Sequence, residues 1–200
     1  MSYDFFAYLS RLKYIRRWSL MRSTEPENVQ EHSHVCAVLA HALGLIRRDV
    51  LGKPCDPEHL AAVALFHDAP EIFTSDLPTP IKYHSDGLKA AYDEVEAGAA
   101  ARLLASLPEP LRASYDALLS AHRDPAEYEL VRAADKLSAY IKCVEERKAG
   151  NREFASAEAS TLRRLREMAL PELDYFLERF MPGFEKTLDE LGTLEGGNEA

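Results

Sequence analysis

The spacing of apolar residues predicts helices along almost the whole chain. Near its start, apolar residues recur at helical intervals with basic residues between them, at Phe5, Tyr8, Leu9, Leu12 and Ile15. A basic amphipathic helix of this kind is able to lie on a membrane surface. The same stripe is also typical of a helix that packs on its own domain, and we favour that interpretation.

Proline, glycine and short polar runs separate the later helices. Leu77-Pro78-Thr79-Pro80 is expected to be a loop, because proline is excluded from helix interiors and restricts the residue before it. We find no convincing strand and no repeat, so the pattern predicts an all-α single domain over residues 1–191, with a disordered tail at 192–200. Helices are expected near residues 29–48, 57–73, 88–107, 111–122, 126–149, 154–169 and 171–191.

Composition narrows the possible partners and the compartment. A net charge of −9 disfavours a nucleic-acid polymer as partner, although a metal ion and one or two arginines would still allow a small phosphorylated substrate. No stretch approaches the roughly 18 apolar residues that span a bilayer. Cys36, Cys55 and Cys143 show no paired spacing, which fits a reducing cytoplasm. We interpret Cys36 and Cys143 as small buried hydrophobes rather than redox or ligand residues.

The first candidate for chemistry lies at the end of the predicted helix over 57–73. A nearly unbroken apolar run, residues 61–66, leads directly to His67-Asp68. Burying this pair without partners is costly, and a cation is one of the few partners that satisfies both side chains. Glu71 follows one turn later on the same side of the helix, with Pro70 disturbing the alignment. The sequence therefore predicts a metal site here.

Two further residues have similar settings on other predicted helices. His32 precedes the apolar pattern Val35, Val38, Leu39, Ala42, and a histidine there is either a ligand or a core residue. Asp135 lies between Val131 and Ala139 on an apolar stripe, although it is also able to pair with a neighbouring base on the surface. Each residue taken alone leaves both interpretations open.

In this order, His32, His67-Asp68 and Asp135 resemble the H…HD…D pattern of the HD superfamily of phosphohydrolases. The resemblance extends over nearly the whole chain to one branch, the bacterial HD-domain 5′-deoxynucleotidases. It rests on Arg11-Leu12-Lys13, Arg17-Trp18, Asn28-Val29, Glu31-His32-Ser33, His67-Asp68-Ala69, Glu71, Asp76-Leu77-Pro78-Thr79-Pro80, Lys82-Tyr83 and Asp174-Tyr175-Phe176.

The resemblance implies an all-α HD fold that hydrolyses 2′-deoxyribonucleoside 5′-monophosphates to deoxynucleoside and phosphate. It implies that His32, His67, Asp68 and Asp135 hold one divalent cation, with Co²⁺ or Mn²⁺ as activators. Mixed nitrogen and oxygen ligands also accept Zn²⁺ or Fe²⁺, and Mg²⁺ less well. No second site is expected, because the other histidines are interpreted as structural or exposed: His34, His41, His59, His84 and His122.

The resemblance also implies roles around the substrate. Glu71 matches the catalytic acid; it either positions water or protonates the leaving 5′-oxygen, and its alternative role is to support His67. Arg17 is placed on the phosphate and Trp18 against the sugar 2′ position. Without the resemblance, Arg17 is equally an exposed charge on the helix surface and Trp18 an aromatic residue that anchors the core. Asp76 is able to accept a bond from the 3′-hydroxyl or to begin a proline turn. The implied pocket also includes Leu77, Pro78 and Thr79, together with His32, Asp68 and Asp135.

Alternatives stay open for the substrate, for catalysis and for assembly. The same metal site could serve a triphosphate, a cyclic nucleotide or a signalling nucleotide, and an HD scaffold could also be a non-catalytic nucleotide sensor. The intact ligands and Glu71 favour the enzyme. Aromatic residues near the C-terminus either form a homodimer interface, as the family precedent implies, or pack internally: Tyr175, Phe176, Phe180 and Phe184.

Overall fold

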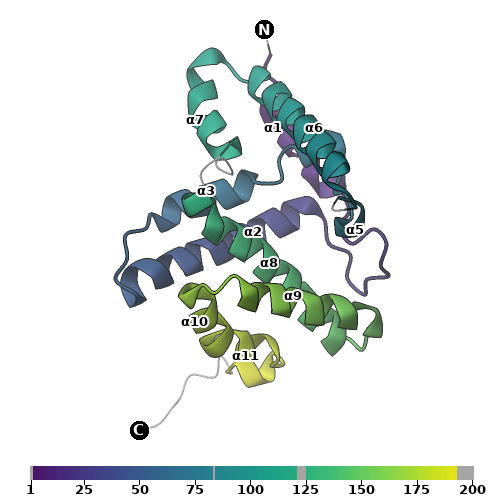
Figure 1. The fold of residues 1–200 in the computed structure, drawn as a ribbon, viewed down its shortest axis with the longest axis vertical. Coiled ribbons are helices and arrows are strands. Elements are labelled where there is room, and N and C mark those ends of the chain that lie inside the picture. The colour runs from purple at the N-terminus through teal and green to yellow at the C-terminus, as the bar shows by residue number, and fades with distance from the viewer. Residues whose placement is uncertain (1, 83, 121–124, 193–200) are drawn as a thin grey trace.

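The computed structural model describes residues 2–82, 84–120 and 125–192, and within these ranges the side chains of Thr79 and of residues 125–127 are not described. The predicted positions of Tyr83 and His122, and the expected tail over 193–200, lie outside the described residues. In the described part of the chain there is no extended strand, and one isolated antiparallel bridge joins Arg16 to Asn28. The all-α prediction is therefore confirmed (Figure 1).

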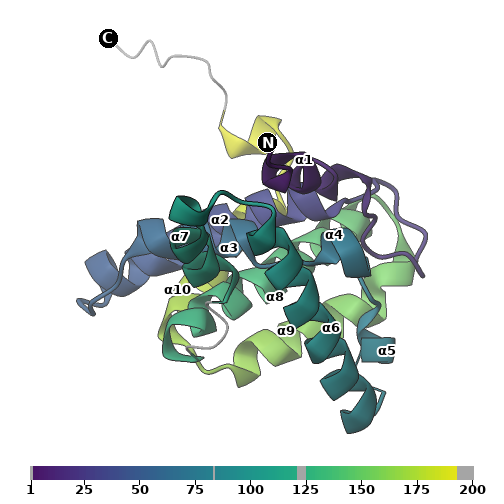
Figure 2. The ribbon, with the colours of Figure 1, turned by 90° about the horizontal axis from the view of Figure 1, so that it is seen from above.

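The helices are stacked in three groups (Figure 1). Helices α2, α3 and α8 lie across the middle, α1, α6 and α7 lie on one side of them, and α9 to α11 lie on the other; Figure 2 gives the perpendicular view. The elements are α1 (Phe5–Leu9), η1 (Leu12–Tyr14), α2 (Val29–Leu45), η2 (Ile46–Val50), α3 (Pro57–Phe66), α4 (Glu71–Thr74), α5 (Thr79–Lys82), α6 (Asp86–Ala105), α7 (Glu109–Leu119), α8 (Pro125–Lys148), η4 (Arg152–Phe154), α9 (Ala155–Glu167), α10 (Pro171–Arg179), α11 (Met181–Phe184) and η5 (Asp189–Leu191).

The main core forms where α2, α3 and α8 meet, and helices α9 to α11 close it. Gly44 lets α2 and α3 approach closely: a Cβ atom there would lie 3.0 Å from Pro57 Cα, tighter than most Cβ contacts, so that the neighbouring residue would have to move. A second, smaller cluster lies under α1, α4, α6 and α7, around Phe5 and Leu103. Arg47 donates to the fully buried Glu172 at 2.6 Å, which ties the end of α2 to α10.

The N-terminal prediction needs correction. The expected continuous helix divides into α1 and a 3-10 turn, and the Ser10 hydroxyl donates to the Ala7 carbonyl at 2.8 Å where α1 ends. Such local bonds compete with helix continuation. Phe5 and Leu12 are buried in the protein, as the packing interpretation requires. Among the described residues, every helix is too short or too polar to span a bilayer.

Two further boundaries differ from prediction because of proline. The helix expected over 57–73 ends at Phe66, and α4 begins after Pro70, which has no N–H to offer the Phe66 carbonyl. Conversely, the segment expected to be a loop enters helix α5 at Thr79, since proline is accepted in a first turn. Helix α2 also finishes in a π-helical turn, η2, rather than running regularly to residue 48.

Candidate functional site

His32 lies in the first turns of α2, and a capping box holds this end of the helix. The Asn28 side chain accepts from the Glu31 backbone N–H while the Glu31 carboxylate accepts from the Asn28 N–H. The imidazole of His32 is fully buried, and its Nδ1 lies 3.2 Å from Ser138 Oγ on α8. Its Nε2 therefore faces two carboxylates, 3.5 Å from Asp68 Oδ2 and 3.2 Å from Asp135 Oδ1.

His67 and Asp68 lie in the turn that Pro70 imposes after α3. His67 Nδ1 lies 2.6 Å from the Ala64 carbonyl oxygen; because a carbonyl only accepts, Nδ1 carries the proton. The other ring nitrogen, Nε2, faces the site, where it would bind a cation once its own proton is released. It lies 3.2 Å from Asp68 Oδ2 but is buried without a hydrogen bond. Helix breaking by Pro70 thus places both side chains beside His32.

The negative charges of Asp68 and Asp135 favour a positive charge within this cluster. Burial lowers the pKa of His67, but the Asp68 and Asp135 charges outweigh it and raise the value to about 9. Burial raises the pKa of Asp68, but His67 and His32 outweigh it and lower the value to about 2. Burial likewise raises the pKa of Asp135, but the hydrogen bond to His32 and the charge of His32 outweigh it and hold the pKa below its usual range. The donor set and the orphaned Nε2 of His67 fit a divalent cation.

Glu71 begins α4 next to this cluster and is buried, with Oε2 lacking a hydrogen-bond partner among the described residues. Burial is the largest cause that raises its pKa, and the charges of Asp68 and Asp76 add to it, bringing the value to about 10. In the metal-free protein Glu71 is therefore protonated at neutral pH. A neutral carboxyl is able to donate a proton.

Arg17 and Trp18 lie on a loop whose ends are joined by the Arg16–Asn28 bridge. Glu27 holds both side chains: its Oε2 accepts from Arg17 Nε at 3.1 Å and from Trp18 Nε1 at 2.8 Å. Trp18 has φ +57°, a strained conformation for a bulky residue and one that recurs at functional sites. Arg17 Nη1 reaches to 3.6 Å from Asp68 Oδ2, so the guanidinium lies beside the cluster.

A buried polar network fixes this loop against α8. Glu146, 1% exposed, accepts from the Thr24 backbone N–H at 2.8 Å and from the Asn151 side chain at 2.8 Å. Lys142 donates to Glu146 at 2.6 Å and to the Glu25 carbonyl at 2.5 Å. Burial raises the pKa of Glu146, but these hydrogen bonds outweigh it and hold the pKa below its usual range. The loop is therefore rigidly held.

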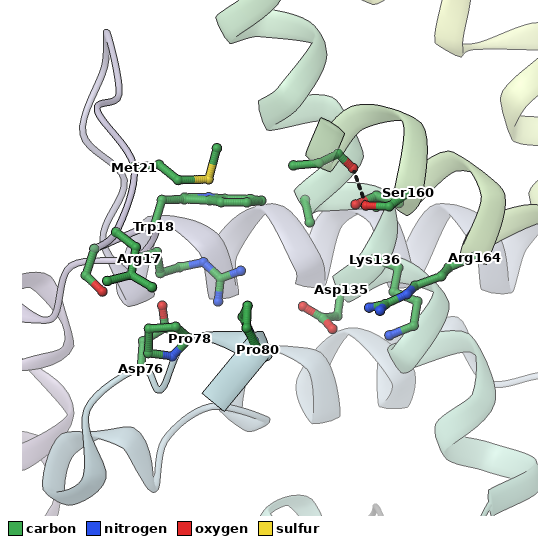
Figure 3. A pocket seen from close by; sticks show the side chains of 15 residues that line it. Arg17, Trp18, Met21, Asp76, Pro78, Pro80, Asp135, Lys136, Ser160 and Arg164 are labelled. Atoms are coloured by element: carbon green, nitrogen blue, oxygen red, sulfur yellow. Dashed lines mark hydrogen bonds between the residues drawn. The ribbon is translucent and has the colours of Figure 1, made fainter. Parts of the chain in front are cut away.

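A cavity of about 630 Å³ opens beside Asp135 (Figure 3). Figure 3 shows Arg17 and Trp18 on one side, Asp76 and Pro78 below them, and Lys136 and Arg164 near Asp135 on the other side. Asp76 follows Ser75, which has φ +60°. Burial raises the pKa of Asp76 and the Arg17 charge opposes this.

Most of the predicted site residues are brought together. His32, His67, Asp68 and Asp135 converge, Glu71 lies beside them, and five predicted residues line the cavity: Arg17, Trp18, Asp76, Pro78 and Asp135. Leu77 is partly buried and is not among the lining residues, and the side chain of Thr79 is outside the described part. His34 is exposed, as expected.

Sequence reasoning missed three features. Glu27 organises Arg17 and Trp18, and only its position before the capped helix hinted at a role. Ser160, Thr161 and Arg164 of α9 line the cavity, and nothing in their sequence context predicted that. Cys36, interpreted as a plain hydrophobe, lies one turn after His32 with Sγ 3.4 Å from its Nε2. That helical spacing was the available signal.

Solved structures with the same architecture identify the class. An HD-domain phosphohydrolase from Listeria innocua aligns with a TM-score of 0.77 at 27% identity, covering 90% of this chain and 88% of that one. A cyanophage S-2L HD phosphohydrolase (DatZ), solved with dA and one catalytic Zn²⁺, shares the fold with a TM-score of 0.62 at 22% identity, covering 90% and 96%. The fold is that of the HD-domain phosphohydrolases.

Sequence comparisons give the family. A 5′-deoxynucleotidase of Vibrio cholerae is 47% identical over 94% of this chain and 97% of its own, and one of Vibrio parahaemolyticus is 45% identical with the same coverage. The family model described as 5′-deoxynucleotidase YfbR-like matches residues 4–184. The chain belongs to this 5′-deoxynucleotidase YfbR-like family.

Proposed function

We propose that this chain is a metal-dependent 5′-deoxynucleotidase that hydrolyses 2′-deoxyribonucleoside 5′-monophosphates to deoxynucleoside and inorganic phosphate. One observation carries the proposal. Two imidazoles and two carboxylates from α2, the turn after α3 and α8 converge beside a buried, neutral Glu71, next to a cavity that Arg17 and Trp18 line. The family relationship supports the choice of substrate.

His32, His67, Asp68 and Asp135 would hold one divalent cation. A cation bound there acts as a Lewis acid on a phosphate oxygen and lowers the pKa of a coordinated water. Of the candidates, Co²⁺ and Mn²⁺ are favoured, and the mixed nitrogen and oxygen donors also suit Zn²⁺ or Fe²⁺ better than Mg²⁺. Because all four donors are already close together, little rearrangement is needed to bind the ion.

The protein's own groups divide the remaining work. Arg17 offers a planar fork to the phosphate oxygens, and Glu27 fixes the orientation of that fork. Glu71, which burial keeps protonated in the metal-free protein, lies beside this cluster as the group to donate a proton to the leaving 5′-oxygen. Trp18, held by Glu27 and by the Phe154 ring 5.2 Å away, crowds the sugar 2′ position, while Asp76 accepts from the 3′-hydroxyl.

The decisive assay compares phosphate release from dAMP and AMP by metal-stripped protein to which Co²⁺, Mn²⁺ or Mg²⁺ is restored. We expect turnover only with metal and strongly for the deoxynucleotide. Equal rates on both nucleotides would remove the role given to Trp18. Pyrophosphate or tripolyphosphate as a product from other nucleotides would indicate a different substrate. Binding without turnover under every metal would indicate a sensor.

Assembly and location are further parts of the proposal. We expect a homodimer, because α2 exposes two valines on one face, Val35 (36%) and Val38 (56%), and the neighbouring α3 exposes Leu65 (44%). Of the C-terminal aromatics, Phe180 is 49% exposed, whereas Phe176 is buried and Tyr175 and Phe184 pack on the core. The free state of all three cysteines supports a reducing cytoplasm, and the acidic charge supports a small-molecule partner rather than nucleic acid.

A further inference from the structure

The sulfur of Cys36 lies inside the cluster of candidate metal ligands. Cys36 is one helical turn after His32 on α2 and is fully buried. Donor atoms of four side chains, His32, Cys36, His67 and Asp135, all lie within 4.8 Å of one another. The thiol thus shares this space with three of the four residues assigned to the cation.

These separations suit direct coordination. Ligand atoms at about 2.0–2.3 Å from one cation lie roughly 3–4.5 Å from one another, so a small side-chain adjustment is enough to bring all four donors onto one ion. A second observation points to a ligand at the same place: His67 Nε2 is buried and has no hydrogen-bond partner among the described residues. The cysteine is therefore part of a built donor cluster.

A simple hydrogen bond to His32 accounts less well for the position of the thiol. Cys36 Sγ lies 3.4 Å from Nε2 and 3.7 Å from Nδ1 of the same ring. A thiol that donated along the direction of the Nε2 lone pair would be much farther from Nδ1. The sulfur therefore lies off that direction and leaves the lone pair open. Cys143, equally buried, is not part of the cluster, so burial alone does not place a cysteine there.

We propose that Cys36 is an additional metal ligand that biases this site toward Zn²⁺ and Co²⁺ over Mn²⁺ and Mg²⁺. Thiolate is a soft ligand that favours the former ions, whereas carboxylates and water suit the latter. On binding, the thiol releases its proton to solvent as the sulfur–metal bond forms, and no atom changes oxidation state. The proposal rests on the metal site proposed above, and the experiment separates the two.

The test is a Co²⁺ titration of the metal-stripped full chain, followed by absorption spectroscopy. Visible d–d bands report that Co²⁺ is bound, and a near-ultraviolet sulfur-to-cobalt charge-transfer band reports a thiolate ligand. We expect both bands in the unmodified protein. Visible bands without the charge-transfer band would overturn the role of Cys36 and leave the proposed function intact. The absence of both would overturn the metal site itself.

Variants assign the band and measure the preference. Cys36→Ser and the apolar Cys36→Val should lose the charge-transfer band but keep the visible bands, whereas Cys55→Ser and Cys143→Ser should keep both; circular dichroism checks folding. Competition with a chelator should show Zn²⁺ affinity falling by about tenfold or more in Cys36→Ser. Mn²⁺ affinity should change far less. An unchanged preference between Zn²⁺ and Mn²⁺, or a band that persists in both Cys36 variants, would refute the proposal.

Discussion

Glu71 is a buried carboxyl whose pKa is raised in the folded protein from 4.5 to about 10. In that range the folded metal-free protein keeps a proton that the unfolded chain releases, so this group makes folding less favourable as pH rises. Glu71→Gln removes the titration. We expect the variant to lose turnover by at least about 100-fold. We also expect the metal-free variant to gain stability over wild type at pH 8.5, by more than about 1 kcal/mol, with a smaller gain at pH 5.5.

Thermal unfolding of the chelator-treated proteins at the two pH values measures this effect. Glu94→Gln, on the exposed part of α6, is the matched control and should leave both activity and the pH dependence unchanged. If the stability difference between Glu71→Gln and wild type were the same at both pH values, Glu71 would not be held neutral by the fold. Normal turnover in Glu71→Gln would remove this residue from the mechanism.

Glu27 acts through other side chains, because it orients Arg17 and Trp18 without lining the cavity itself. A glutamine at this position keeps one acceptor oxygen but loses the charge that holds the guanidinium. We predict that Glu27→Gln raises KM for dAMP and narrows the ratio of dAMP to AMP turnover, since Trp18 is less firmly placed. Steady-state kinetics on both nucleotides test this, with the exposed Glu25→Gln as control. An unchanged ratio would mean that Trp18 is positioned by Phe154 and the backbone alone.

At the scale of elements, the sequence indicated which helices carry the site but not how they end. The run before His67-Asp68 identified α3, and the order of His32, the His-Asp pair and Asp135 identified the three converging segments. The turn at Pro70 was anticipated only as a disturbance, whereas it ends the helix and leaves the His67 ring 5.4 Å from the His32 ring. Local patterns define where a helix begins more reliably than how a proline redirects it.

Contacts between distant segments could not be predicted outside the four metal-site residues. The bonds from Thr24 to Glu146 join residues more than 120 positions apart, and the placement of α9 over the cavity depends on how it packs on α8. Periodicity also misjudged the face of α2: Val35 and Val38 are exposed, and the buried stripe includes His32, Cys36 and Leu39. An apolar residue is not by itself evidence of burial.

Helix α9 contributes a basic group to the cavity that the family motif does not include. Arg164 lies near Lys136 and Asp135 in Figure 3, and no ion pair to it is found among the described residues. We predict that Arg164→Ala raises KM for dAMP by about tenfold, the effect of losing one charge-assisted hydrogen bond, with little change in kcat. The neighbouring Arg163→Ala is the control, because Arg163 is 70% exposed and pairs with Glu167 at 3.7 Å. Equal effects of the two variants would indicate general electrostatics rather than contact with the nucleotide.

At the scale of the whole molecule, the exposed apolar face of α2 predicts self-association. Val35 and Val38 are three residues apart and therefore share one helix face, and Val38 is 56% exposed. A carboxylate at the centre of an apolar interface is costly to bury without a partner, whereas on a free surface it costs little. We therefore expect Val38→Asp to convert a dimer to a monomer while the helical content stays unchanged. Light scattering after size-exclusion chromatography gives the mass directly, and Leu188→Asp, at a position 84% exposed, should leave it unaltered.

A wild-type protein that is monomeric at micromolar concentration would refute the dimer, and a Val38→Asp dimer would exclude this face as its interface. Because neither Val35 nor Val38 lines the cavity, we expect the monomeric variant to keep metal-dependent turnover of dAMP. Loss of turnover in a folded Val38→Asp monomer would show that assembly supports the arrangement of α2 and, with it, the position of His32.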